Sequence, residues 1–314
     1  MSSSITKPSA DSARPSRSTV SENEVRDAQS AVLRGVYTKP DAWDRFAQSY
    51  LWAPEVKILV RYRDDIFGRR VLDIGVGAGR TTKYLADLAA EYTGIDYSDV
   101  MVQATRKRFP LLRLENADVR DLSAFADSSF DCVFAPSAVL DALSHADRLR
   151  ALAEIRRVLV ENGLFAFSGH NRAAPRNPPY PRLDYSKDPL LLARYGLRWL
   201  REIAHRMKYR RYELETDDYA ILNDASFEWR GLHYYCSREA QARQLEAAGF
   251  RLMECFAMDG MSHEPGRVSM HDYKLHYVCR TTSARQWEPR RESRRRHERR
   301  RAERRAAQSG GSRV

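Results

Sequence analysis

The sequence predicts a doubly wound α/β fold, a mainly parallel sheet with helices on both faces, and three observations lead to this fold class. A strand-like apolar run, Val71–Ile74, stops in a glycine-rich turn. The turn opens a helical pattern over Thr81–Ala90, where apolar residues recur at helical spacing. A second strand-like run, 92–96, follows that helix and ends in a carboxylate. A strand, a glycine turn, a helix and a second strand form the entrance of such a fold.

Gly75, Gly77 and Gly79 occupy alternate positions of the turn, and Asp73 lies two positions before the first of them. Glycines let a nucleotide-like ligand approach the backbone, and the first N–H groups of the following helix face that ligand. A dinucleotide-binding turn would have its third glycine one position later, where this chain has Arg80. The Walker pattern of phosphate-binding loops is absent too, because no Gly-Lys-Ser/Thr follows the turn.

The stretch DIGVGAGR at 73–80 resembles the first motif of the class I S-adenosylmethionine-dependent methyltransferases. Three further stretches resemble that family in the correct order: DYSDVM at 96–101, SSFDCVFAPSAV at 128–139 and EIRRVLVENGLFAFS at 154–168. The resemblance implies a seven-stranded Rossmann-like sheet with an antiparallel last strand, an N-terminal helical cap and a lid inserted after the fifth strand. It also implies S-adenosyl-L-methionine as the cofactor.

The resemblance assigns cofactor contacts to residues at the ends of the first four strands. Asp96 would accept hydrogen bonds from both ribose hydroxyls, a task that suits a carboxylate. Tyr97 would pack on the adenine, and Asp118 and the N–H of Val119 would bind the adenine edge. The residues expected to bind the cofactor are Asp73, Gly75, Gly77, Gly79, Asp96, Tyr97, Met101, Asp118, Val119, Ala135 and Pro136.

The remaining elements continue the alternation of strands and helices. Helical patterns over 37–67 would form the N-terminal cap, with one apolar stripe at Trp43, Phe46 and Tyr50. Later strands are expected at 112–118, 128–139, 164–168, 251–257 and 274–280, and later helices at 148–160 and 237–248. We therefore expect a disordered segment at 1–30, a methyltransferase domain at 31–284 with its insertion at about 172–235, and an Arg-rich disordered tail at 285–314.

The insertion holds the least regular part of the sequence. A helix is expected over 189–211, with apolar residues on one side and basic residues on another. We interpret it as a lid over the cofactor domain, the alternative being a face that attracts an anionic substrate or a lipid surface. The stretch 214–235, dense in polar and aromatic residues, is interpreted as a binding loop that closes the pocket with Asp224 and His233 among others. NPPY at 177–180 follows the fifth strand rather than the fourth, so we interpret it as a stiff connector rather than an amine-binding motif.

Three residues are candidates for a general base, which an alcohol or phenol acceptor would require. His170 follows the fifth strand at the carboxyl edge of the sheet, where ligands bind in this fold class, and it is the first candidate. His233 is the second, and Asp141, beyond the fourth strand, is the third. Holding the acceptor in line with the methyl group and the departing sulfur supplies most of the catalysis.

The net charge of +11 invites a nucleic-acid interpretation, which its distribution does not favour. Residues 285–314 contribute +8 and residues 1–40 contribute +2, so 41–284 is close to neutral at +1. The leading hypothesis is therefore methyl transfer to an O or N atom of a small molecule, a saccharide or a secondary metabolite. An RNA- or protein-directed methyltransferase that uses the basic tail, and a cofactor-binding module without turnover, are the alternatives.

The cysteines, histidines and apolar runs indicate in which compartment the protein works and whether it binds a metal. Four widely spaced cysteines without a CxxC pair indicate buried free thiols in a reducing compartment. No metal-ligand spacing occurs among the eight histidines, so no metal is expected. Neither a secretory signal nor an apolar run of the ~20 residues that span a membrane is present. We expect a cytoplasmic protein, and the sequence indicates no oligomeric state.

Overall fold

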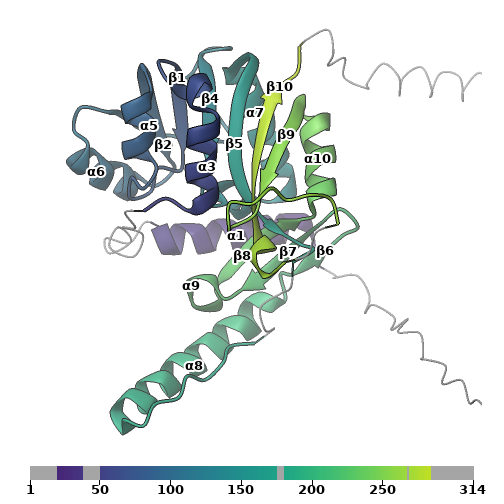
Figure 1. Ribbon diagram of the computed structural model, residues 1–314. Coiled ribbons are helices and arrows are strands. Elements are labelled where there is room, and N and C mark those ends of the chain that lie inside the picture. The colour runs from purple at the N-terminus through teal and green to yellow at the C-terminus, as the bar shows by residue number, and fades with distance from the viewer. Residues whose placement is uncertain (1–19, 38–49, 175–179, 267–268, 284–314) are drawn as a thin grey trace, which may run out of the picture.

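The computed structural model describes residues 20–37, 50–174, 180–266 and 269–283. A ten-stranded mixed sheet forms the centre of this part of the chain, and helices cover both of its faces (Figure 1). The predicted α/β fold class is confirmed.

Five parallel strands lie in the order β3-β2-β1-β4-β5. The strands are β1 (Arg70–Ile74), β2 (Glu91–Asp96), β3 (Arg113–Asn116), β4 (Phe130–Ala135) and β5 (Leu159–Asn171). The helices of this part are α3 (Ala53–Arg61), α4 (Arg63–Ile66), α5 (Thr82–Leu88), α6 (Asp99–Arg108) and α7 (His145–Val158), with a 3-10 turn η1 (Val139–Ala142). Val71 and Leu72 point to opposite faces of β1 and are both fully buried, as expected for a parallel sheet that is covered on both faces.

The sheet continues beyond β5 with an antiparallel pair. β10 (Lys274–Thr281) runs antiparallel between β5 and β9 (Phe250–Phe256). α10 (Arg238–Ala247) precedes β9, and the hydroxyl of Ser237 accepts a hydrogen bond from the Ala240 N–H at 3.1 Å to cap it. These strands complete the predicted seven-stranded core with its antiparallel last strand.

Three further strands come from the insertion, so 214–235 is not the binding loop that was expected. Ser226, Phe227 and His233 of this stretch do line the pocket, as expected. β6 (Leu214–Glu215), β7 (Tyr219–Asp224) and β8 (Gly231–Cys236) form an antiparallel meander whose β8 joins the end of β5. Nearly every residue of β7 and β8 is buried, because neighbouring elements cover both faces of these strands. A strand that is buried on both faces lacks the alternation by which a strand is recognised in a sequence.

The helix that covers the cavity from the N-terminal side is α1 (Glu22–Tyr37). It lies before the range 37–67 predicted for the cap and begins within the segment expected to be disordered. Its start is a capping box: the Ser21 N–H donates to Glu24 Oε2 at 2.9 Å, and the Glu24 N–H donates to Ser21 Oγ at 3.3 Å. Val25 is fully buried in a cluster with side chains of β7 and β8. The boundary at residue 30 is therefore too late. Most of the stripe formed by Trp43, Phe46 and Tyr50 lies outside the described residues, as do most of NPPY and the Arg-rich tail.

All four cysteines are free and buried, as expected.

Candidate active site

A cavity of about 610 Å³ opens at the carboxyl ends of the parallel strands. The glycine turn after β1, the end of β2 and the loop after β4 line one side of it. Side chains from α1, β5, β8 and β10 line much of the rest, so the cavity extends from the glycine turn to the insertion. Its volume lies within the range of sites for small molecules and cofactors.

The glycine turn has the geometry of a cradle for a ligand. Gly77 has a φ of +51°, and a Cβ placed on it would meet no other atom closer than 3.9 Å. Its N–H donates to Asp96 Oδ2 at 2.9 Å, which ties the turn to the end of β2. A Cβ on Gly79, by contrast, would lie 2.7 Å from the ring of Phe109. Gly79 is thus required by packing, and Gly77 keeps the cavity open.

Asp96 is buried in the protein and lines the cavity. One oxygen accepts from Gly77, and the other accepts from the Ser98 N–H at 2.9 Å. Burial raises the pKa of Asp96, and these two hydrogen bonds oppose that rise. A carboxylate has about four acceptor positions, so two remain for the hydroxyls of a ligand.

Ten of the fourteen predicted site residues line the cavity, and four do not. Those that line it are Gly75, Gly77, Asp96, Tyr97, Met101, Asp118, Val119, Pro136, His170 and His233. Those that do not are Asp73, Gly79, Ala135 and Asp141. Asp73 is fully buried beneath the turn, where it accepts from Tyr92 Oη at 2.8 Å and from Thr81 Oγ1 at 3.2 Å. Burial raises its pKa to about 7. Its carboxylate thus supports the turn from beneath and does not line the cavity.

Asp118 faces the cavity but is held by Arg120, whose Nη2 lies 2.6 Å from its Oδ2. Burial alone would raise the pKa of Asp118. The hydrogen bonds from Arg120 have the larger combined effect, so the pKa is lowered. Val119, the next residue, also lines the cavity.

The opposite end of the cavity holds His170, at the end of β5. Its Nδ1 lies 2.8 Å from Asp141 Oδ2, and its backbone N–H donates to the same oxygen. Asp141 is almost fully buried and forms an ion pair of 2.6 Å with the buried Arg148. Burial lowers the pKa of His170 despite the neighbouring carboxylate. His170 is therefore neutral near pH 7, with Asp141 fixing the ring from behind.

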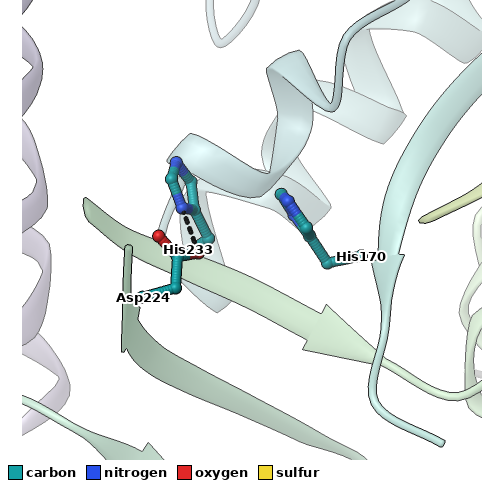
Figure 2. Close-up of side chains that lie close together, drawn as sticks. All are labelled: His170, Asp224 and His233. Atoms are coloured by element: carbon teal, nitrogen blue, oxygen red, sulfur yellow. Dashed lines mark hydrogen bonds and ion pairs between the residues drawn. The ribbon is translucent and has the colours of Figure 1, made fainter. Parts of the chain in front are cut away.

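His233 on β8 forms a second histidine–carboxylate pair. Its Nδ1 lies 2.7 Å from Asp224 Oδ2, which also accepts from Tyr235 Oη at 2.9 Å. Burial lowers the pKa of His233, but the carboxylate of Asp224 outweighs it, and the pKa is raised. Figure 2 shows the His170 ring beside the His233–Asp224 pair, and the two imidazole centroids are 5.1 Å apart. The fold thus brings together the three predicted catalytic residues, with Asp141 behind His170.

His170, Asp224 and His233 also form a set that could hold a metal ion. Each offers a ligand atom, and these atoms lie within 4.8 Å of one another. The spacing of the histidines in the sequence gave no sign of this set. In the structure Asp224 accepts three hydrogen bonds, from His233, Tyr235 and the Ser226 N–H. These bonds hold the Asp224 carboxylate in place and orient the His233 ring.

The expected role of the helix over 189–211 as a lid is wrong. α8 (Pro189–Arg210) contributes no residue to the lining of the cavity among the residues described. Its contacts are with the insertion itself: Arg206 Nη1 donates to Asn223 Oδ1 at 3.1 Å, and His205 Nδ1 lies 2.8 Å from the Glu228 carbonyl oxygen. α8 therefore projects away from the sheet (Figure 1).

The cavity is closed instead by α1 and by α9 (Ser226–Trp229). Phe227 in α9 has a φ of +56° and meets the Tyr37 ring of α1 edge-on, with centroids 5.7 Å apart. Left-handed backbone at a non-glycine residue is strained and persists where the surroundings enforce it, often at binding sites.

Sequence reasoning missed a cationic wall of the cavity. Lys274 Nζ and the Arg80 guanidinium lie 4.8 Å and 4.4 Å from the centroid of the Trp52 ring. Arg80 also pairs with Glu55 and donates to Ser137 Oγ at 2.6 Å. Burial lowers the pKa of Lys274. Lys274 lies opposite His170 because the last strand pairs antiparallel with β5. The expected antiparallel last strand was therefore the signal that could have placed Lys274 at the site.

Comparison with known proteins finds that part of the chain is similar to methyltransferases. Residues 71–163 match a family described as "Methyltransferase domain". A probable S-adenosylmethionine-dependent methyltransferase of Mycolicibacterium smegmatis is 30% identical over 123 residues, which are 37% of this chain and 46% of that protein. The demethylmenaquinone methyltransferase of Tropheryma whipplei is 42% identical over 71 residues, 21% of this chain and 28% of that protein. The match thus spans less than half the length of each of these two relatives.

Solved structures extend the likeness of the fold beyond the matched segment. The 1,6-didemethyltoxoflavin-N1-methyltransferase of Burkholderia thailandensis is 16% identical, with a TM-score of 0.51 over 84% of this chain and 92% of that chain. The CcbJ methyltransferase of Streptomyces caelestis is 19% identical, with a TM-score of 0.51 over 79% of this chain and 98% of that chain. At these identities the likeness shows a shared fold.

Proposed function

We propose that the chain is a class I S-adenosylmethionine-dependent methyltransferase and that it transfers a methyl group to an O or N atom of a small molecule. The similarity of residues 71–163 to methyltransferase domains supports the first part of the proposal. The observation that carries the proposal is the single cavity, which joins the glycine turn and Asp96 at one end to His170 and His233 at the other. The cofactor would occupy the first end and the acceptor the second.

The residues at the first end fit the cofactor in shape and in chemistry. Asp96 would accept hydrogen bonds from the ribose hydroxyls, and the open backbone at Gly77 would allow close approach of the ligand. Tyr97 and Met101 would contact the adenine, and the Val119 N–H would bind its edge. S-Adenosylmethionine, when bound, supplies a methyl group on a positively charged sulfur.

The residues at the second end suit a proton transfer from the acceptor. The two histidines have pKa shifts of opposite sign, lowered at His170 and raised at His233. Neighbouring titratable groups that are shifted apart in this way divide into a base and an acid. His170, neutral and fixed by Asp141, would take the proton of the acceptor. His233, whose charged form is favoured by Asp224, would donate a hydrogen bond to the acceptor atom.

This division predicts two histidine titrations on either side of the ordinary imidazole pKa of about 6.5. In a ¹H–¹⁵N NMR titration, we expect the signal that disappears in His170→Ala to titrate below that value. The signal that disappears in His233→Ala should titrate above it. A general base must be neutral, so the rate of methyl transfer should fall as the pH drops through the lower of the two values. The opposite order of the two titrations would contradict the assignment of His170 as the base.

We expect methyl transfer to be unaffected by a chelator, because proton transfer by the His170–Asp141 and His233–Asp224 pairs needs no metal ion. The measurement compares rates before and after dialysis against EDTA, with Mn²⁺, Zn²⁺ or Mg²⁺ added back. A rate that is lost on dialysis and restored by one of these ions would make His170, Asp224 and His233 metal ligands instead.

A small-molecule acceptor is supported by the near-neutral charge of 41–284 and by the name of the demethylmenaquinone methyltransferase among the relatives. The test incubates the protein with S-adenosylmethionine carrying a labelled methyl group and a cell extract separated into small-molecule, RNA and protein fractions. We expect label in the small-molecule fraction, where mass spectrometry identifies the product. Label in the RNA or protein fraction would contradict the proposal, and cofactor binding without label in any fraction would indicate a binding module. The cytoplasmic location stays a prediction.

A further inference from the structure

α8 carries an apolar stripe that nothing in the described part of the chain covers. Leu190, Leu197, Leu200 and Met207 are 77%, 71%, 57% and 74% exposed, and the exposed Ala193 and Ala204 lie between them. These six residues, the α8 stripe, follow one another at intervals of three or four, which places them on one side of a helix. At 1.5 Å per residue the stripe is about 26 Å long.

The opposite side of α8 packs against the rest of the protein. Glu202 and Arg206 are its buried residues, and Trp199 Nε1 donates to the Pro181 carbonyl oxygen at 3.2 Å. Because the packed face and the α8 stripe lie on opposite sides of the helix, the stripe faces outward along the projecting arm that Figure 1 shows. An exposed apolar patch of this kind marks an interaction surface.

Basic residues run beside the stripe. Lys187, Arg194, Arg201 and Lys208 recur every seven residues and are all exposed. Within the described ranges only Arg201 of these four pairs with a carboxylate, that of Glu228 at 2.8 Å. The helix itself contains six Arg and Lys and a single carboxylate, the buried Glu202. The stripe is therefore flanked by positive charge without exposed negative charge on the same helix.

We propose that α8 docks on the surface of a lipid bilayer that contains anionic lipids. The leucines and Met207 would enter the boundary between headgroups and acyl chains, while the basic row meets the negative surface. A second copy of this chain fits less well, because pairing two stripes would bring two basic rows together. A nucleic acid would attract the basic row and leave the leucines in water. No helix among the described residues combines the length and apolar character needed to cross a bilayer, so the contact is with the surface.

The test must separate α8 from residues 285–314, whose 12 Arg would also attract anionic lipids. The full chain with Leu200→Cys is labelled with an environment-sensitive fluorophore, which is possible because the four native cysteines are buried. Leu111, 97% exposed in the connection between α6 and β3, provides the control Leu111→Cys. With vesicles of phosphatidylglycerol and phosphatidylcholine, we expect a blue shift and quenching by brominated lipids for position 200 and neither for position 111. Pure phosphatidylcholine vesicles should give a much weaker response.

Variants of α8 measure how much each part of the surface contributes. Leu197→Glu with Met207→Glu should lower the vesicle affinity of the full chain at least tenfold, whereas Leu111→Glu should not change it. Each of Arg194→Gln and Lys208→Gln should lower it about fivefold, the effect of one basic residue near an anionic surface. Vesicle binding without a response at position 200 would assign the binding to another part of the chain and overturn the proposal. A dimer in light scattering that the double Glu variant dissociates would assign the stripe to a second copy. None of these measurements needs an acceptor, so they stand apart from the test of the proposed function.

Discussion

Replacing Asp96 with alanine is expected to weaken the binding of S-adenosylmethionine about 100-fold while the fold survives. The carboxylate would accept two hydrogen bonds from the ribose, and hydrogen bonds to a charged group contribute roughly 1.5 kcal/mol each or more. A loss of about 3 kcal/mol corresponds to a factor of about 100 in the dissociation constant. Isothermal titration calorimetry on the purified variant measures this dissociation constant.

A matched control lies three residues further along the chain. Asp99 is exposed in the first turn of α6 and does not line the cavity, so Asp99→Ala should bind the cofactor as tightly as the unaltered protein. Asp96→Asn keeps the shape of the side chain, and its affinity for the cofactor should lie between those of Asp96→Ala and Asp99→Ala. Cofactor affinity that is unchanged in Asp96→Ala would refute the ribose assignment.

His170→Ala is expected to lower the turnover of methyl transfer by roughly 10²- to 10⁴-fold, the usual contribution of a general base. Affinity for S-adenosylmethionine should change less than about threefold, because His170 lies at the acceptor end of the cavity. Single-turnover kinetics with the identified acceptor gives the rate, and calorimetry gives the affinity.

His271 offers the control for this variant, because it is exposed and outside the cavity. His271→Ala should keep full activity, and thermal unfolding of both variants shows whether either loses stability. Full turnover in His170→Ala would remove it as the base and leave His233 as the candidate. A turnover that falls only in proportion to cofactor affinity would make His170 a binding residue.

The cofactor end of the site could be predicted in large part from the sequence because it is built from local signals. Gly75 and Gly77 are set by the backbone of one tight turn, and Asp96 and Asp118 by the ends of two successive strands. These positions follow from short segments whose order along the chain is also their order in the sheet. Asp73 is different, because its place next to the turn does not determine whether its side chain faces the cavity or the core, and only the packing beneath the turn decides it.

The acceptor end depended on contacts between segments that are remote in the sequence. The sequence indicates His170 and His233 separately as candidate bases. The pairing of β5 with β8 brings their rings together, and β7 places Asp224 behind His233. The strands of the insertion carry no alternation, because both of their faces are buried, so their meander could not be recognised in advance. The projection of α8 likewise could not be predicted: an apolar face indicates that a helix packs against something, and only the tertiary structure decides which face is already covered.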